Sequence, residues 1–290
     1  MLNALGMSPR SNPSLLSAGV YIVGAGPGDP ELLTVKAQKL IAQADVILFA
    51  DSLIPQQILE GARSDAEIIQ TASKTLEEIL PLMIERVRSG GSVVRLHSGD
   101  PSLYSAVQEQ MQALVEADIP FEVVPGISAF QLAAARLRVE LTIPGVVQSI
   151  ILTRMSGRTE VPIDEELSSL ATHRASLCLY LSARHVENAQ TKLMQHYSAD
   201  TPVAICFRLG WADEQIRLVR LDQMAIVTHE QDLVRTTLYV ISPALAAETV
   251  PSKFGLLDRE VWMGQRSRLY HPGHSRLFRE KSDKAKNEDD

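Results

Sequence analysis

The sequence predicts a two-domain α/β protein, with a mostly parallel βαβ domain at residues 19–126 and an α+β domain with a mixed sheet at residues 127–247. Three observations support this prediction. Between residues 20 and 125, short β-branched runs alternate with amphipathic helical patterns. After residue 140, strand patterns follow one another with fewer helices between them, as in antiparallel and mixed sheets. The chain has 290 residues, 45% of them hydrophobic, which is enough material for two cores.

The first domain is predicted from five strand patterns and four helical patterns. β-branched and apolar runs predict strands at 20–24, 45–50, 66–70, 92–97 and 121–124. Apolar residues at helical spacing predict helices at 31–44, 55–62, 75–89 and 102–117. Asp29 and Asp100, each followed by proline, are expected to cap the first and last of these helices. In a parallel sheet, the loops that follow the strands share one edge, where ligands bind.

The second domain is predicted to contain five more strands and three helices. The strands are expected at 148–154, 175–181, 201–208, 214–221 and 236–242, with helices near 164–172, 184–197 and 222–230. Outside both domains, we expect a flexible N-terminus at 1–18, a C-terminal extension at 248–279 and a disordered charged tail at 280–290.

Composition limits the classes of partner. The formal net charge is −7 and the basic residues are scattered, which argues against nucleic acid as a partner. No apolar run approaches the roughly 18 residues that span a bilayer, so we expect a cytoplasmic protein with no membrane partner. The two cysteines, Cys178 and Cys206, lie in apolar runs that are typical of buried strands. The seven histidines show no metal-ligand spacing, so no protein-bound metal is expected.

The loop "GAGPGD" at 24–29 allows two interpretations. A glycine-rich turn after a first strand is typical of phosphate-binding loops, but Asp29 occupies the sixth position, where dinucleotide fingerprints have glycine or alanine. No Gly-Lys-Ser/Thr follows, so a nucleotide-hydrolase loop is also disfavoured. The alternative is a tight turn in which Asp29 caps a helix. "HSGDPS" at 97–102 and "PGISA" at 125–129 are similar special loops, and all three are expected at one edge of the sheet.

Three motifs in this order and spacing resemble the tetrapyrrole methyltransferases: "VGAGPGDPELLTVKA" at 23–37, "VVRLHSGDPSLYS" at 93–105 and "VVPGIS" at 123–128. Within that family, the segments at 44–55, 98–110, 140–162, 200–216 and 235–245 are similar to the branch that methylates C-11 of precorrin-4 or cobalt-precorrin-4 in cobalamin synthesis. The alternatives among methyltransferases are methylation at another ring position (C-20, C-17, or C-2 and C-7 of uroporphyrinogen III) or of a protein side chain. Asp29 disfavours a nicotinamide oxidoreductase, and a simple binding module would not explain special loops on three strands.

The resemblance implies a two-domain homodimer with its active site in the cleft between the domains and S-adenosylmethionine as methyl donor. The residues that it assigns to the cofactor are Pro27, Ser98, Gly99, Asp100, Leu103, Ser128, Ala129, Leu181, Leu209 and Thr237. The substrate would be a tetrapyrrole, with or without cobalt, whose carboxylates need local cations. Arg154 and Arg158 are candidates for that role by position, and His97 and Tyr104 are candidates for lining the substrate site. We expect no specific general acid or base, because the nucleophile would be an electron-rich ring carbon that its own pyrrole nitrogen activates.

Overall fold

The structure, a computed structural model, describes residues 16–157 and 159–246 and divides into two compact units, each described here by itself. The first unit reaches Ala133 and also includes Cys206–Gln215, while the second comprises Ala134–Ile205 and continues from Ile216. The division therefore falls later than the expected boundary at 126/127, and a short segment from far along the chain belongs to the first unit. Most of the expected N-terminal segment 1–18, and all of the expected extension at 248–279 and tail at 280–290, lie outside the described residues.

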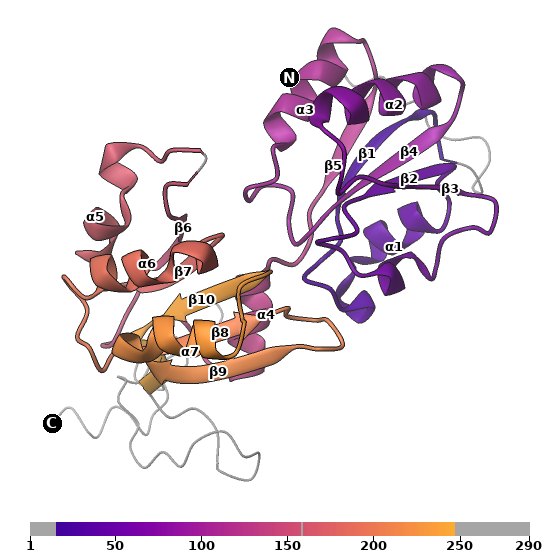
Figure 1. Ribbon diagram of the computed structural model, residues 1–290. Coiled ribbons are helices and arrows are strands. Elements are labelled where there is room, and N and C mark those ends of the chain that lie inside the picture. Colours follow the sequence, from indigo (N-terminus) through magenta and orange to yellow (C-terminus); the bar gives the residue numbers. More distant parts are fainter. Residues whose placement is uncertain (1–15, 158, 247–290) are drawn as a thin grey trace, which may run out of the picture. The chain divides into compact units, whose positions relative to one another are not determined.

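The first unit is built on a parallel five-stranded sheet with strand order β3-β2-β4-β1-β5 (Figure 1). The strands are β1 (Gly19–Gly24), β2 (Val46–Phe49), β3 (Glu67–Gln70), β4 (Ser92–His97) and β5 (Phe121–Val124). The helices are α1 (Val35–Ile41), α2 (Leu76–Arg88) and α3 (Val107–Glu116), with 3-10 turns η1 (Pro30–Leu32) and η2 (Gln56–Leu59). The next helix, α4 (Ala129–Leu137), contains the division between the two units. Strand β1 pairs in parallel with β4 and β5, and β2 pairs in parallel with β3 and β4. The predicted parallel βαβ domain is therefore confirmed.

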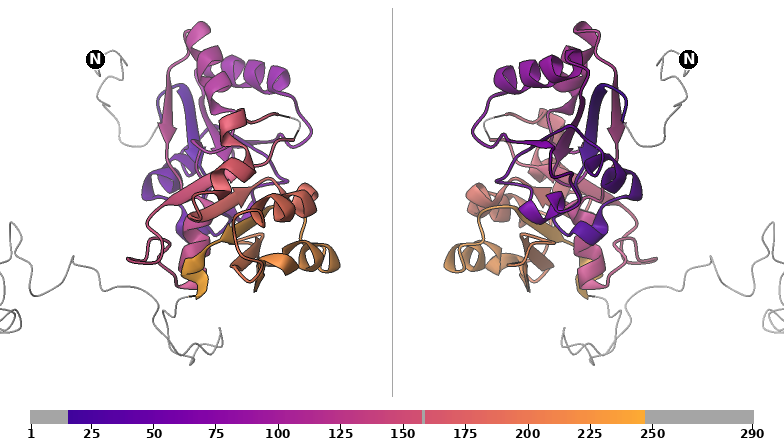
Figure 2. Two further views of the ribbon diagram at one scale, coloured as in Figure 1. Left: turned by 90° about the vertical axis from the view of Figure 1, so that its left-hand side faces the viewer. Right: turned by 90° about the vertical axis from the view of Figure 1, so that its right-hand side faces the viewer.

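Helices cover both faces of this sheet: α1 lies on one face, and α2 and α3 lie on the other (Figures 1 and 2). Alternate residues of β1 serve the two cores. Tyr21 and Val23 pack in the cluster that contains Leu40 of α1, whereas Val20 and Ile22 pack in the cluster that contains Met83 of α2. Every residue of β1 is buried, as expected for a central strand of a doubly covered parallel sheet.

Two helices of the first unit begin later than the sequence predicts. Asp29 caps only η1, through a hydrogen bond from the Glu31 amide to Oδ1 (3.0 Å), and α1 begins at Val35 behind its own cap, Thr34. Asp100 likewise does not cap α3, which begins at Val107. Both aspartates do accept a hydrogen bond from a backbone amide two residues later, but each bond stabilises a turn that precedes the helix and not the helix itself.

The second unit contains a mixed five-stranded sheet with strand order β6-β7-β10-β8-β9. The strands are β6 (Ile150–Arg154), β7 (Ser176–Tyr180), β8 (Pro202–Phe207), β9 (Gln215–Arg220) and β10 (Thr237–Ile241). The helices are α5 (Leu167–Ala171), α6 (Val186–Leu193) and α7 (Met224–Glu230), with 3-10 turns η3 (Ile163–Glu165), η4 (Ala183–His185), η5 (Leu221–Gln223) and η6 (Pro243–Ala246). Strand β7 pairs in parallel with β6 and antiparallel with β10, and α6 packs against both α5 and α7. The predicted α+β domain with a mixed sheet is confirmed.

Candidate active site

Three loops of the first unit meet at one edge of its parallel sheet. Strands β4, β1 and β5 are neighbours, and their last residues are in register: Gly24 lies beside His97, and Val23 lies beside Val124. The loops that follow these strands are the glycine-rich segments at 24–29, 98–104 and 125–128. The sequence-based expectation that they share one edge is therefore confirmed.

Backbone hydrogen bonds join the first loop to the second. Gly26 and Gly99 form a reciprocal pair, in which each amide donates to the carbonyl of the other (3.2 and 2.8 Å), and the Ala25 amide donates to the His97 carbonyl (2.8 Å). Gly26 and Gly99 have φ angles of 69° and 68°, in the left-handed region that favours glycine. These hydrogen bonds therefore hold the first and second loops together.

Asp100 connects the third loop to the other two loops by a hydrogen bond. Its Oδ2 accepts a hydrogen bond from the Gly126 amide (2.9 Å), and its Oδ1 accepts one from the Ser102 amide (2.8 Å). Partial burial raises the pKa of Asp100, but the hydrogen bonds from Ser102 and Gly126 outweigh burial and hold the pKa below its usual value. At neutral pH, the ionised carboxylate thus connects two loops by charge-assisted bonds.

Close backbone packing explains why Gly24 and Gly126 carry no side chain. A Cβ at Gly126 would lie 2.2 Å from the Gly99 carbonyl oxygen, and a Cβ at Gly24 would lie 2.5 Å from the Gly126 amide nitrogen. These approaches involve backbone atoms on both sides, so no rotamer change can relieve them. All three loops are in direct contact at these glycines.

This arrangement disfavours the phosphate-binding interpretation of the first loop. A phosphate cradle presents unpaired backbone amides to the ligand. Here, the amides of Ala25 and Gly26 are already paired with the second loop, Pro27 has no amide hydrogen, and Asp29 adds a carboxylate. The glycines serve contact between loops, and the site favours a ligand without phosphate.

The segment 206–215 closes over the end of the first loop. A Cβ at Gly210 would lie 2.7 Å from the Asp29 amide, and one at Gly28 would lie 2.7 Å from the Trp211 ring. The Arg208 guanidinium stacks on the Trp211 ring at 4.0 Å. Leu209, predicted as a cofactor residue, is 4% exposed, and its carbonyl would touch a Cβ at Gly28. No local pattern in the sequence predicts that this segment belongs to the first unit.

The predicted cofactor residues fall into two groups. Eight belong to the first unit, at or next to the joined loops: Pro27, Ser98, Gly99, Asp100, Leu103, Ser128, Ala129 and Leu209. Leu181 and Thr237 belong to the second unit, where they flank the same end of the β7–β10 pair. Leu181 is 69% exposed with a φ of 53°, whereas the Thr237 hydroxyl is buried and donates to the Leu233 carbonyl (2.6 Å).

A buried polar cluster lies beneath the second loop, on the face of the sheet that α3 covers. His97 is 7% exposed, its Nε2 has no hydrogen-bond partner, and Arg95 and Gln110 both lie close enough to the ring to shift its pKa. Burial, together with the positive charge of Arg95, lowers the pKa of His97 to about 3, although the Gln110 side chain acts in the opposite direction. His97 is therefore neutral at physiological pH. The sequence indicated His97 but not Arg95, although an arginine inside the apolar strand "SVVRLH" was the available signal.

The other three residues that we predicted to contact substrate have different surroundings. Tyr104 is 43% exposed and has a left-handed backbone with a φ of 53°. The Arg154 guanidinium donates to the carbonyls of Thr159 (2.7 Å) and Glu160 (3.1 Å), so it supports the loop after β6. Arg158 lies outside the described residues. For these residues, a substrate role stays a prediction.

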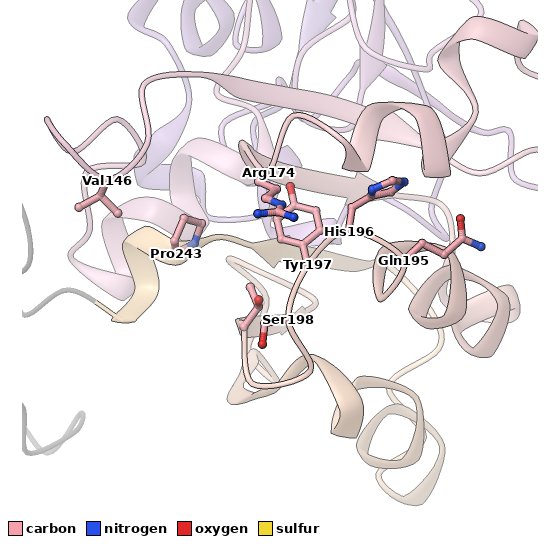
Figure 3. A pocket seen from close by; sticks show the side chains of 8 residues that line it. Val146, Arg174, Gln195, His196, Tyr197, Ser198 and Pro243 are labelled. Atoms are coloured by element: carbon pink, nitrogen blue, oxygen red, sulfur yellow. The ribbon is translucent and has the colours of Figure 1, made fainter.

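Other features of the described residues carry no sign of a second active site. A hollow in the second unit is lined by Arg174, Tyr197 and residues near them (Figure 3). The Tyr197 hydroxyl there donates to the Ala175 carbonyl (2.7 Å), as in an ordinary buried tyrosine. Among residues 16–157 and 159–246, no three acidic, histidine or cysteine side chains gather as metal ligands, and no helix is long and apolar enough to cross a membrane.

Comparisons with known proteins point to one family. The family described as Tetrapyrrole (Corrin/Porphyrin) Methylases matches residues 19–225. The chain is 44% identical to a precorrin-4 C(11)-methyltransferase of Pseudomonas aeruginosa, over 88% of this chain and 99% of that protein. It is 41% identical to a cobalt-precorrin-4 C(11)-methyltransferase of Methanocaldococcus jannaschii, over 78% of this chain and 88% of that protein.

Two solved structures extend this similarity to the fold. A cobalt precorrin-4 methyltransferase superposes with a TM-score of 0.76 at 38% identity, covering 83% of this chain and 99% of that chain. A uroporphyrin-III C-methyltransferase from Thermus thermophilus, solved in complex with S-adenosylhomocysteine, superposes with a TM-score of 0.65 at 28% identity, covering 80% of this chain and 96% of that chain.

Proposed function

The chain belongs to the tetrapyrrole methylase family, and we propose that it transfers a methyl group from S-adenosylmethionine to C-11 of precorrin-4 or cobalt-precorrin-4 in cobalamin biosynthesis. The observation that carries this proposal is similarity along nearly the full length of proteins with that activity, including 99% of the Pseudomonas aeruginosa enzyme. The proposal also places the reaction in the cytoplasm and assigns it to a homodimer.

The joined loops fit S-adenosylmethionine. This molecule has no phosphate, so the carboxylate of Asp29 does not repel it. It also does not need the backbone amides of Ala25 and Gly26, which are already hydrogen-bonded to the second loop. Its sulfonium and ammonium groups carry positive charge, which suits three loops that share the ionised carboxylate of Asp100. The Thermus thermophilus relative, solved with S-adenosylhomocysteine, supports the same choice of ligand.

S-adenosylmethionine supplies an activated methyl group, so the protein's task is alignment and exclusion of water. The loop cluster is suited to alignment because Gly26, Gly99 and Gly126 fix its backbone in one arrangement. As the methyl group moves to carbon, the positive charge leaves sulfur and spreads over the ring, and a site of low polarity favours such dispersal of charge.

The direct test of the activity is incubation of the pure protein with S-adenosylmethionine and either precorrin-4 or its cobalt complex. The proposal predicts release of S-adenosylhomocysteine and a tetrapyrrole product heavier by one methylene unit for at least one of the two substrates. Turnover of uroporphyrinogen III in place of both would favour the alternative ring positions C-2 and C-7.

A pair of glycine variants tests the cofactor site. Gly99 and Gly90 both have positive φ angles (68° and 90°), so Gly99→Arg and Gly90→Arg carry similar backbone strain. Only Gly99 lies in the loop cluster, whereas nothing lies within 4 Å of a Cβ at Gly90. Gly99→Arg should abolish binding of S-adenosylhomocysteine in calorimetry, and Gly90→Arg should keep it. Undiminished affinity in a folded Gly99→Arg protein would remove these loops from the cofactor site.

A further inference from the structure

Arg95 is a buried cation without a counter-ion. It lies on the central strand β4 and is 8% exposed. Its Nη1 donates to the Thr71 hydroxyl (2.9 Å), its buried Nε has no partner, and it forms no ion pair with any described residue. Burial lowers the pKa of Arg95 to about 10, so the guanidinium remains charged at neutral pH. A buried, unpaired charge destabilises a fold, so its presence points to a ligand that supplies the missing anion.

The surroundings of Arg95 place it at the ligand-binding edge of the sheet. Thr71 directly follows β3, and His97 is the last residue of β4, on the same face as Arg95. His97 is followed at once by the loop that contains Gly99 and Asp100. Ligands of parallel α/β sheets bind at this edge. Because His97 is uncharged, it does not compete with Arg95 for an anion.

We propose that the Arg95 guanidinium binds a carboxylate of the tetrapyrrole substrate, with Thr71 orienting the guanidinium. A planar guanidinium whose Nε has no hydrogen-bond partner can bind a carboxylate in a bidentate manner. This inference rests on the proposed function, because that function brings a ring with several peripheral carboxylates to this edge.

The cofactor is the other possible source of a carboxylate, and charge argues against it. S-adenosylmethionine has one carboxylate but two positive groups, so a buried guanidinium would repel it overall. A tetrapyrrole polycarboxylate carries net negative charge and gains from the same guanidinium.

The backbone next to this cluster is strained. Gln110 lies beside His97, and its amide nitrogen donates to the carbonyls of Ser105 (3.4 Å) and Ala106 (3.2 Å). In this segment, Tyr104 and Ala106 have φ angles of 53° and 50°, which strain residues other than glycine. A shift of residues 104–106 would relieve this strain and would move the carbonyls that hold Gln110 beside His97.

The test compares Arg95→Met with Arg88→Met, a matched change at an exposed arginine of α2. Uroporphyrin III, a stable tetrapyrrole polycarboxylate, serves as the probe in fluorescence titration, and S-adenosylhomocysteine is titrated in parallel by calorimetry. Arg95→Met should weaken uroporphyrin binding at least about tenfold, leave S-adenosylhomocysteine affinity within about twofold, and keep or raise Tm because an unpaired buried charge is removed. Arg88→Met should change neither affinity.

Several results would overturn the inference. Unchanged uroporphyrin affinity in Arg95→Met, or no uroporphyrin binding by the wild type, would remove the site. Weaker binding of S-adenosylhomocysteine alone would assign Arg95 to the cofactor, and a folded variant with a lower Tm that loses both ligands would make Arg95 structural.

If Arg95→Met does not fold, Arg95→Lys provides a second test, because lysine keeps the charge but not the planar guanidinium. Arg95→Lys should bind uroporphyrin several-fold more weakly than the wild type, and wild-type affinity would contradict the proposal. A wild type that binds uroporphyrin through Arg95 but does not methylate precorrin-4 would refute only the proposed function.

Discussion

Gly126→Ala should damage both the stability of the protein and its cofactor site. The new Cβ would lie 2.2 Å from the Gly99 carbonyl oxygen and 2.8 Å from the Gly24 Cα, so three loops would have to separate. Overpacking of a close-packed region costs about 1–3 kcal/mol, and we expect the upper end because the clashing atoms are backbone. For a domain of this size, about 3 kcal/mol corresponds to a fall in Tm of roughly 6–12 °C.

The assay is thermal unfolding together with calorimetric titration of S-adenosylhomocysteine, with Gly61→Ala as the matched control. Nothing lies within 4 Å of a Cβ at Gly61, so the same change there should shift stability by less than about 0.5 kcal/mol and leave binding unaltered. Gly126→Ala should lower S-adenosylhomocysteine affinity by at least about tenfold, because the loops that hold it would shift. Wild-type Tm and wild-type affinity in Gly126→Ala would refute the close packing of the three loops.

Three further predictions concern charge, substrate binding and thiol reactivity. Asp100→Asn should lose about 1–2 kcal/mol at pH 7 in urea unfolding, because two charge-assisted bonds are weakened. The pKa of Asp100 in the folded protein lies below its ordinary value, so the ionised carboxylate contributes fully to the free energy of unfolding above the ordinary pKa. This contribution is lost as pH falls through the folded-state pKa, so the stability difference between wild type and Asp100→Asn should shrink in acid. A stability difference that stays constant with pH would contradict this linkage. Arg154→Ala should raise the tetrapyrrole KM without changing S-adenosylhomocysteine affinity, and the reverse pattern would give Arg154 a different role. Burial raises the pKa of Cys178 to about 12, so it should resist alkylation at pH 8 in the native protein and react in denaturant, as mass spectrometry of the labelled peptide would show.

The sequence predicted the site best where local pattern determines structure. Alternation of strands and helices placed the loops after β1, β4 and β5, and parallel pairing then brought them to one edge. The family resemblance rested on the spacing of those same loops and is confirmed by the match over residues 19–225.

What could not be predicted depends on contacts between distant segments. The cap signals at Asp29 and Asp100 are local and genuine, yet Asp100 also bonds to Gly126, and the left-handed backbone at Tyr104 and Ala106 delays the start of α3. The return of residues 206–215 to the first loop has no local signature. The position of Arg95 inside an apolar strand is a local signal, but a strand pattern does not reveal that its charge is buried.

Transfer of a methyl group to C-11 is the property that separates the proposed reaction from methylation at other ring positions, and the position of the new carbon in the product tests it. The protein should be incubated with S-adenosylmethionine labelled with carbon-13 in its methyl group and with each form of precorrin-4, and the product examined by NMR. One enriched methyl signal correlated with C-11 is expected. An enriched methyl group on any other ring carbon, or on nitrogen, would refute methylation at C-11.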